Sequence, residues 1–335
     1  MPSFTDLADL AAERVRGRAL AANDEFFAPK SALLKPGRGE FIAGKYTSRG
    51  KWMDGWETRR RRTPGHDWCV IRLGMPGVVR GVDVDTNHFI GNFPEACSLD
   101  ACRRLGKVSR ADLLGPKTEW IEIVPLSRLQ GGSQNLFPVG EPGAFTHVRL
   151  NIHPDGGVAR LRVYGEVAVD WPALVRSKRP FDLAAIENGG LVLGASDMHF
   201  GSKDNLIMPG RAKNMGDGWE TRRRRGPGHD WLILRLGGPG SIDRIEIDTN
   251  HFKGNYPDSA SLEGCRSPET SVEVLASESP GWQEILPQTR LKPHHRHFWS
   301  RELRARGPFT HVRFRIFPDG GVSRLRIHGR ALASQ

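Results

Sequence analysis

The residues whose types are best suited to binding or catalysis form one block, Asp54-Gly-Trp-Glu-Thr-Arg-Arg-Arg-Arg. A guanidinium fork suits a planar carboxylate or a ureido oxygen, because its paired N–H donors match paired acceptors. Successive side chains of an extended segment alternate, so alternate arginines would share a side. Glu57 and Asp54 lie close enough to orient them. The block predicts a site for a small polar acid or, as the alternative, a charged surface run; the candidate binding residues are Asp54, Trp56, Arg59, Arg60 and Arg61.

A second motif, Gly65-His-Asp-Trp68, follows directly. His66 is a candidate general acid or base, because an unperturbed imidazole titrates near neutral pH. Asp67 is the neighbouring carboxylate. The alternative is that Asp67 caps a turn and that His66 is an ordinary polar residue at the start of a strand.

A third motif, Asp85-Thr-Asn-His-Phe89, ends an apolar stretch. Asn87 offers amide donors and an acceptor, which suits hydrogen bonding to a urea group. His88 is a second candidate acid or base. Turn chemistry alone also explains Asp, Thr and Asn at the end of a strand.

All three motifs occur twice. DGWETRRRR is repeated from Asp217, GHDW from Gly228 and DTNHF from Asp248. FTHVR, followed by PDGGV, is also repeated, so the chain contains two copies of one domain, predicted at about 4–170 and 181–333 with a linker at 171–180. The candidate binding residues of the second copy are Trp219, Glu220, Arg223, His229, Asn250 and His251.

The copies differ at one place that bears on function. The first has an additional stretch, Phe41–Met53, where the second has only Ala212–Gly216. An insertion beside a shared motif indicates two sites that are not equivalent. The alternative is a tolerated loop insertion.

The elements that must position these residues have the pattern of strands. Short apolar or alternating stretches are separated by turn residues such as GMPG, PDGG and GNFP. We therefore predict an all-β protein with two tandem antiparallel β-sandwich domains of jelly-roll type. Val148, Leu150, Ile152, Leu161 and Val163 should face the core, and the arginines that alternate with them should face outward.

The composition fits a globular cytoplasmic protein. The 335 residues contain 38% hydrophobic residues, 26% charged residues and four cysteines. No secretory signal or membrane-spanning apolar run is visible, and few scattered cysteines suit a reducing compartment. The net charge of +11 fits either nucleic acid or a small anionic substrate.

Together the motifs resemble the allantoicase family. The resemblance rests on DGWETRRRR with GHDW, DTNHF-x-GN-[FY]-P, GKYTSRGKWMDGW and the FTHVR…PDGGV segment, and it spans nearly the whole chain. It implies two sandwich domains and a hydrolase that converts allantoate and water into ureidoglycolate and urea, in allantoin and purine degradation. It also implies a homo-oligomer.

The chemistry of that reaction assigns candidate roles. An arginine of the block, or Lys45, would hold the substrate carboxylate, and Asn87 would bind a ureido oxygen. Urea leaves only if its nitrogen is protonated, so a general acid is needed together with a base. We assign these roles to His66 or His88 with Glu57 or Asp67. No cofactor is predicted, no metal ligands are assigned, and a divalent metal is left open.

Two other functions remain as alternatives. A tandem carbohydrate-binding protein would use exposed Trp52, Trp56 and Trp219 as stacking platforms. A nucleic-acid binder would use both arginine runs, but acids are interleaved with the basic segments, and no recognition helix or aromatic platform for RNA is evident. We therefore expect no nucleic-acid and no membrane partner.

Overall fold

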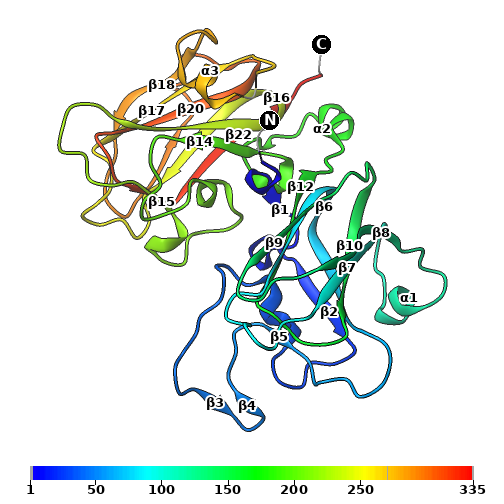
Figure 1. The fold of residues 1–335 in the computed structure, drawn as a ribbon. Coiled ribbons are helices and arrows are strands. Elements are labelled where there is room, and N and C mark those ends of the chain that lie inside the picture. The colour runs from blue at the N-terminus through cyan, green and yellow to red at the C-terminus, as the bar shows by residue number, and fades with distance from the viewer. Residues whose placement is uncertain (1–2, 270, 334–335) are drawn as a thin grey trace. The chain divides into compact units, whose positions relative to one another are not determined.

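The computed structural model describes residues 3–269 and 271–333. The chain divides between Ala168 and Val169 into two compact units, which are treated separately below (Figure 1). Both are built from antiparallel strands with short helices, which confirms the predicted all-β class. No helix in the described ranges is long and apolar enough to cross a membrane.

The first unit consists mostly of short strands around one long strand. Its strands are β1 (Ala8–Asp9), β2 (Arg18–Ala22), β3 (Tyr46–Thr47), β4 (Gly50–Lys51), β5 (Trp56–Glu57), β6 (Asp67–Asp85), β7 (Ala96–Cys102), β8 (Ile121–Arg128), β9 (Gln134–Pro138), β10 (Ala144–His153), β11 (Gly157–Val158) and β12 (Arg160–Val167). Its helices are α1 (Arg110–Leu114) and the 3-10 helices η1 (Phe4–Asp6), η2 (Glu13–Val15) and η3 (Lys30–Leu34).

The second unit repeats this order without a counterpart of the β3–β4 hairpin. Its strands are β13 (Phe181–Asp182), β14 (Leu191–Ala195), β15 (Trp219–Glu220), β16 (Asp230–Asp248), β17 (Ser259–Cys265), β18 (Gln283–Arg290), β19 (Arg296–Trp299), β20 (Phe309–Phe317), β21 (Gly321–Val322) and β22 (Arg324–Ala331). Its helices are α2 (Trp171–Ser177), α3 (Val272–Ala276), η4 (Ile186–Asn188), η5 (Lys203–Ile207) and η6 (Met215–Asp217).

The long strand β6 organises the first sandwich. Its first half pairs with β2 and β10, and its second half pairs with β9 and β12. The same strand therefore pairs with β2 and β10 on one side of the sandwich and with β9 and β12 on the other. Its pairing with β10 skips the residues between Arg72 and Gly77. The prediction that GMPG, residues 74–77, forms a turn is wrong, because this stretch lies inside the continuous strand β6. Strand β16 plays the same part in the second unit.

The predicted core is confirmed. Val148, Leu150, Ile152, Leu161 and Val163 are fully buried. This follows from the two-residue period of a strand with one face against the other layer.

The prediction that the neighbouring arginines all face outward is wrong for Arg160. Arg160 is 2% exposed, and its guanidinium donates to the Asp54 carboxylate at 2.5 Å and to the Asp54 carbonyl at 2.8 Å. Arg324 and Asp217 form the same pair in the second unit. Burial of a charge is tolerated here because a carboxylate and carbonyl oxygens accept from it.

Residues 171–177, within the predicted linker, form the helix α2. The Trp171 ring lies edge-on to Phe181, and its Nε1 donates to the carbonyl of Leu332 at 3.0 Å. This segment therefore packs within the second unit.

Candidate active site

The site begins at β5, where alternation separates two neighbouring side chains. Trp56 is fully buried, and its Nε1 donates to the carbonyl of Asp24 at 2.8 Å. Glu57 points the other way and is half-buried. Pairing of β5 with β11 and a bridge to Ala28 fix this arrangement.

Glu57 lies where two cavities meet. One, of about 450 Å³, is also lined by Lys51, Met53 and His88. The other, of about 560 Å³, is also lined by Arg60, Arg61 and Asp155. Both cavities share four residues, namely Phe27, Glu57, Gly91 and Asn92. A ligand with two arms could therefore place its centre beside the Glu57 carboxyl.

The Glu57 carboxyl is adapted to carry a proton. Burial raises its pKa, and the hydrogen bond from Asn92 Nδ2 to Glu57 Oε1, at 2.7 Å, opposes that rise only in part. A carboxyl with a raised pKa keeps its proton closer to neutral pH and can act as a general acid. The Asn92 amide also fixes the direction of the carboxyl group.

The arginine block is held by acids from elsewhere in the chain. Arg59 pairs with Asp24 at 2.7 Å, and Arg61 pairs with the buried Asp67 at 2.7 Å. The predicted alternation is wrong, because the segment after Glu57 is not a strand and both Arg60 and Arg61 line the larger cavity.

Asp54 does not orient these arginines, since its partners are Arg160 and Lys35. Its carboxylate instead accepts from the backbone N–H of Glu40 at 3.2 Å. Asp54 therefore ties together the two ends of the inserted stretch.

The two predicted histidines lie in different surroundings. His88 lines the smaller cavity, and its backbone has a φ of 68°, in the left-handed region. His66 is exposed and packs against the His153 ring, with 4.7 Å between centroids, and it lines neither cavity. Asp67 also lies outside both cavities, where it accepts from Arg61 and Asn23. Of the four predicted catalytic residues, the structure brings together Glu57 and His88.

Lys45 and Asn87 also lie outside the cavity walls. The Lys45 ammonium lies 3.7 Å from the centre of the Trp52 ring. Asn87 Nδ2 donates to the carbonyl of Arg38 at 3.1 Å. The cation that the inserted stretch contributes to the smaller cavity is Lys51.

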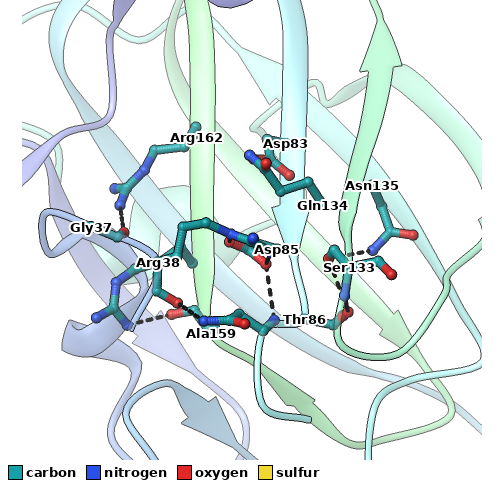
Figure 2. A network of polar contacts seen from close by, with 12 residues as sticks. Gly37, Arg38, Asp83, Asp85, Thr86, Ser133, Gln134, Asn135, Ala159 and Arg162 are labelled. Atoms are coloured by element: carbon teal, nitrogen blue, oxygen red, sulfur yellow. Dashed lines mark hydrogen bonds and ion pairs between the residues drawn. The ribbon is translucent and has the colours of Figure 1, made fainter. Parts of the chain in front are cut away.

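Through its bond to Arg38, Asn87 joins a network that anchors the base of the insertion. Figure 2 shows Gly37, Arg38, Asp85 and Arg162 of this network. Arg38 donates to both oxygens of Asp85, at 2.8 and 3.0 Å, and Arg162 donates to the carbonyl of Gly37. A bidentate pair of this kind fixes direction as well as distance. The chain therefore enters the insertion from a defined position.

Asp83, in the same network, should make stability depend on pH. Burial, with a further contribution from Asp85, raises its pKa to about 6, and one of its oxygens is buried without a partner. The folded state holds this proton up to about pH 6, whereas an unfolded chain loses it near pH 4, so this group destabilises the fold above that window.

We expect Asp83→Asn to raise the free energy of unfolding at pH 8 by up to about 3 kcal/mol and to change it little at pH 4. Urea unfolding at both values measures this. The matched control is Glu246→Gln, because Glu246 is paired with Arg296 at 2.7 Å and should give no gain. Equal effects of Asp83→Asn at both pH values would contradict the assignment.

The second unit keeps much of this framework. Trp219 is fully buried, Asn255 donates to Glu220, and Arg224 pairs with Asp230 at 2.5 Å. The prediction of exposed stacking platforms is therefore wrong for Trp219, as it is for Trp56.

Among the residues that the structure describes, the remaining predicted residues of the second unit have separate surroundings. His251 Nε2 is bonded to the carbonyl of Ala212 at 3.0 Å, and the backbone N–H of Asn250 donates to Asp248. Arg223 is exposed. His229 lines a separate cavity, which does not include Glu220 among its lining residues.

Sequence reasoning missed several wall residues of the first unit. Asn92 lies in the repeated motif GN-[FY]-P and returns as Asn255, so the duplication held a signal for it. Lys51 and Met53 lie in the insertion, whose presence in one copy was the available signal. Phe27 lies outside the quoted site motifs. Among the described residues there is no group of three or more His, Cys, Asp or Glu side chains placed to hold a metal ion.

Comparison with known proteins decides the family. The allantoicase repeat matches twice, at residues 8–168 and 181–332. The chain belongs to the allantoicase family. A probable allantoicase of Burkholderia mallei is 51% identical, over 98% of this chain and 96% of its own length. A probable allantoicase of Ralstonia nicotianae is 52% identical, over the same shares. The crystal structure of an allantoicase from Saccharomyces cerevisiae aligns with a TM-score of 0.81 at 34% identity, covering 96% of this chain and 92% of that one.

Membership of the allantoicase family confirms the predicted resemblance, the fold class and the prediction of a hydrolase. The carbohydrate-binding alternative is not favoured.

Proposed function

We propose that the chain hydrolyses allantoate to ureidoglycolate and urea, and that the reaction takes place at the paired cavities of the first unit. The observation that supports this place is Glu57, a half-buried carboxyl with a raised pKa at the junction of the two cavities. Allantoate has a central carbon with two ureido arms and one carboxylate. Two adjoining cavities can accept the two arms, one in each.

In this proposal the charged walls orient the substrate. Lys51 lines the smaller cavity and Arg60 the larger one. Neither is in any ion pair described among residues 3–269 and 271–333, whereas Arg59 and Arg61 have carboxylate partners. Lys51 or Arg60 is therefore the cation for the substrate carboxylate, and Arg61 shapes the wall.

The proton transfers follow from the positions of Glu57 and His88. Glu57 gives its proton to the nitrogen of the leaving ureido group as the C–N bond breaks. Water forms the new C–O bond and loses a proton to His88, which shares the smaller cavity. Transfer of that proton back to Glu57 restores the starting state, so the products are ureidoglycolate and urea.

The second unit lacks some of the residues to which the reaction is assigned here. Lys51 and Met53 belong to the insertion, which has no counterpart there. His251, the counterpart of His88, has its ring bonded to a backbone carbonyl. We therefore assign catalysis to the first unit.

A urea-release assay on allantoate tests the proposed activity. The purified chain should release one urea for each ureidoglycolate formed. The same assay with and without a chelator tests the open question of a divalent metal. No urea above the uncatalysed rate in either condition would contradict the proposal.

Replacing Asn92 tests the proposed general acid. Asn92→Ala removes the donor that favours the charged form of Glu57, so the Glu57 pKa should rise further. Because a general acid works only while protonated, the alkaline fall of kcat/KM should move to higher pH. The matched control, Asn255→Ala, should leave the profile in place. A pH profile of Asn92→Ala that superimposes on the unmodified one would remove Glu57 from this role.

We further propose a cytoplasmic homo-oligomer that acts in allantoin and purine degradation on a free small molecule, without a nucleic-acid or membrane partner. The support is the family membership and the composition.

A further inference from the structure

We propose that the second unit carries an oxyanion-binding site that is separate from the cavities at Glu57. It lies in a cavity of about 320 Å³ lined by Arg224, His229, Trp231, Glu278, Arg313 and Arg315, among others. Its ligand class is a small anion with at least two neighbouring oxygens, a carboxylate or a phosphate. This inference does not depend on the proposed reaction.

Two of the arginines are fixed in place by acids behind them. Arg313 is 2% exposed, donates from Nε to Glu263 at 2.7 Å, and has its guanidinium 4.8 Å from the centre of the Trp282 ring. Arg224 is paired with Asp230 at 2.5 Å. A receptor that is held before the ligand arrives loses less entropy on binding.

The third arginine, Arg315, leaves donor capacity unused. It reaches Glu263 at 3.0 Å through Nη2, but its Nε is buried without a hydrogen-bond partner. The Nε of Arg224 is in the same condition. Buried donors usually have an acceptor, so Arg224 and Arg315 each keep one donor that no described protein group satisfies.

The carboxylate of Glu278 already occupies part of this arginine cluster. Glu278 Oε1 accepts from Arg313 Nη2 at 3.0 Å and from Arg315 Nη2 at 3.4 Å. Its side chain is 79% exposed, so water screens its attraction to the two arginines. A dissolved anion can therefore displace it at small cost. Three guanidiniums would then face two carboxylates, those of Asp230 and Glu263, which leaves one positive charge for the ligand.

This arrangement is specific to the second copy. In the duplicated segments Asn151 stands at the position of Arg315 and Pro116 at that of Glu278. The first copy keeps the counterparts of the other two arginines, Arg61, paired with Asp67 at 2.7 Å, and Arg149, paired with Asp100 at 2.8 Å. Arg315 and the exposed Glu278 therefore occur together in the second copy and are both missing from the first, as expected if they serve one purpose.

Isothermal titration of the full chain with inorganic phosphate, and separately with malonate, at constant ionic strength tests the site. We expect saturable binding of at least one anion. Arg315→Asn, which installs the first copy's residue, should weaken it at least tenfold. Glu278→Gln should tighten it several-fold, because it removes the competing carboxylate.

The outcomes are distinguishable from those of the proposed reaction. Glu57→Gln should leave anion binding unchanged, and Arg315→Asn should still release urea from allantoate. Binding of phosphate alone or of malonate alone would identify the ligand chemistry. No saturable binding of either anion, or unchanged affinity in both Arg315→Asn and Glu278→Gln, would overturn the inference.

Discussion

Glu57→Gln should lower kcat for urea release from allantoate by about 10²–10⁴-fold, the range that a positioned general acid contributes. Glutamine keeps the size of the side chain and its contact with Asn92 but cannot deliver a proton to the leaving nitrogen. KM should change much less, because the proposed carboxylate-binding cations, Lys51 and Arg60, remain in place. Steady-state kinetics with a coupled urea assay measures both constants.

The duplication supplies a matched control for this experiment. Glu220 occupies the same position in the second unit and has the same asparagine partner, Asn255. Glu220→Gln should therefore retain most of the activity if only the first unit is catalytic. Equal losses in the two variants would show that both units react, and loss in Glu220→Gln alone would reverse the assignment.

Arg160→Ala should destabilise the first unit by about 3–5 kcal/mol, because it leaves the Asp54 carboxylate without its buried partner. Burial alone would raise the pKa of Asp54, but hydrogen bonding and the charge of Arg160 outweigh it and hold that pKa below its usual range. Asp54 also holds the backbone of Glu40, so the inserted stretch should lose its anchor. Urea unfolding of the variant measures the stability, and a raised KM would report the displaced cavity wall.

An exposed pair provides the comparison for Arg160. Arg80 and Glu166 lie 3.0 Å apart, with side chains 38% and 50% exposed. Arg80→Ala should therefore change the free energy of unfolding by no more than about 1 kcal/mol. If Arg160→Ala is no more destabilising than Arg80→Ala, the buried pair does not anchor the insertion.

The features that repeat or alternate could be predicted from the sequence. The duplicated motifs gave the two copies, and the alternation around Val148 and Leu150 gave the buried face of a strand. Both are local patterns, and local patterns survive folding when one face of a sheet must be buried. The prediction that Trp56 and Trp219 are exposed was wrong. Each lies in a strand of two residues, which is too short for alternation to show which side chain is buried.

Pairings between distant residues could not be predicted. The acid partners of Arg59 and Arg160 are Asp24 and Asp54, which lie 35 and 106 positions away. Periodicity says which face a side chain takes but not which loop meets it there. The position of His88 at the cavity, and of His66 outside it, also depends on how separate loops meet. The same limit hid Phe27, which lines both cavities.

The most direct test of the proposed active site is a crystal structure of the Glu57→Gln variant with allantoate bound. We expect allantoate in the paired cavities of the first unit, with a ureido nitrogen within hydrogen-bond distance of residue 57 and the carboxylate against Lys51 or Arg60. Allantoate bound only elsewhere, with both cavities at residue 57 free of it, would contradict the account.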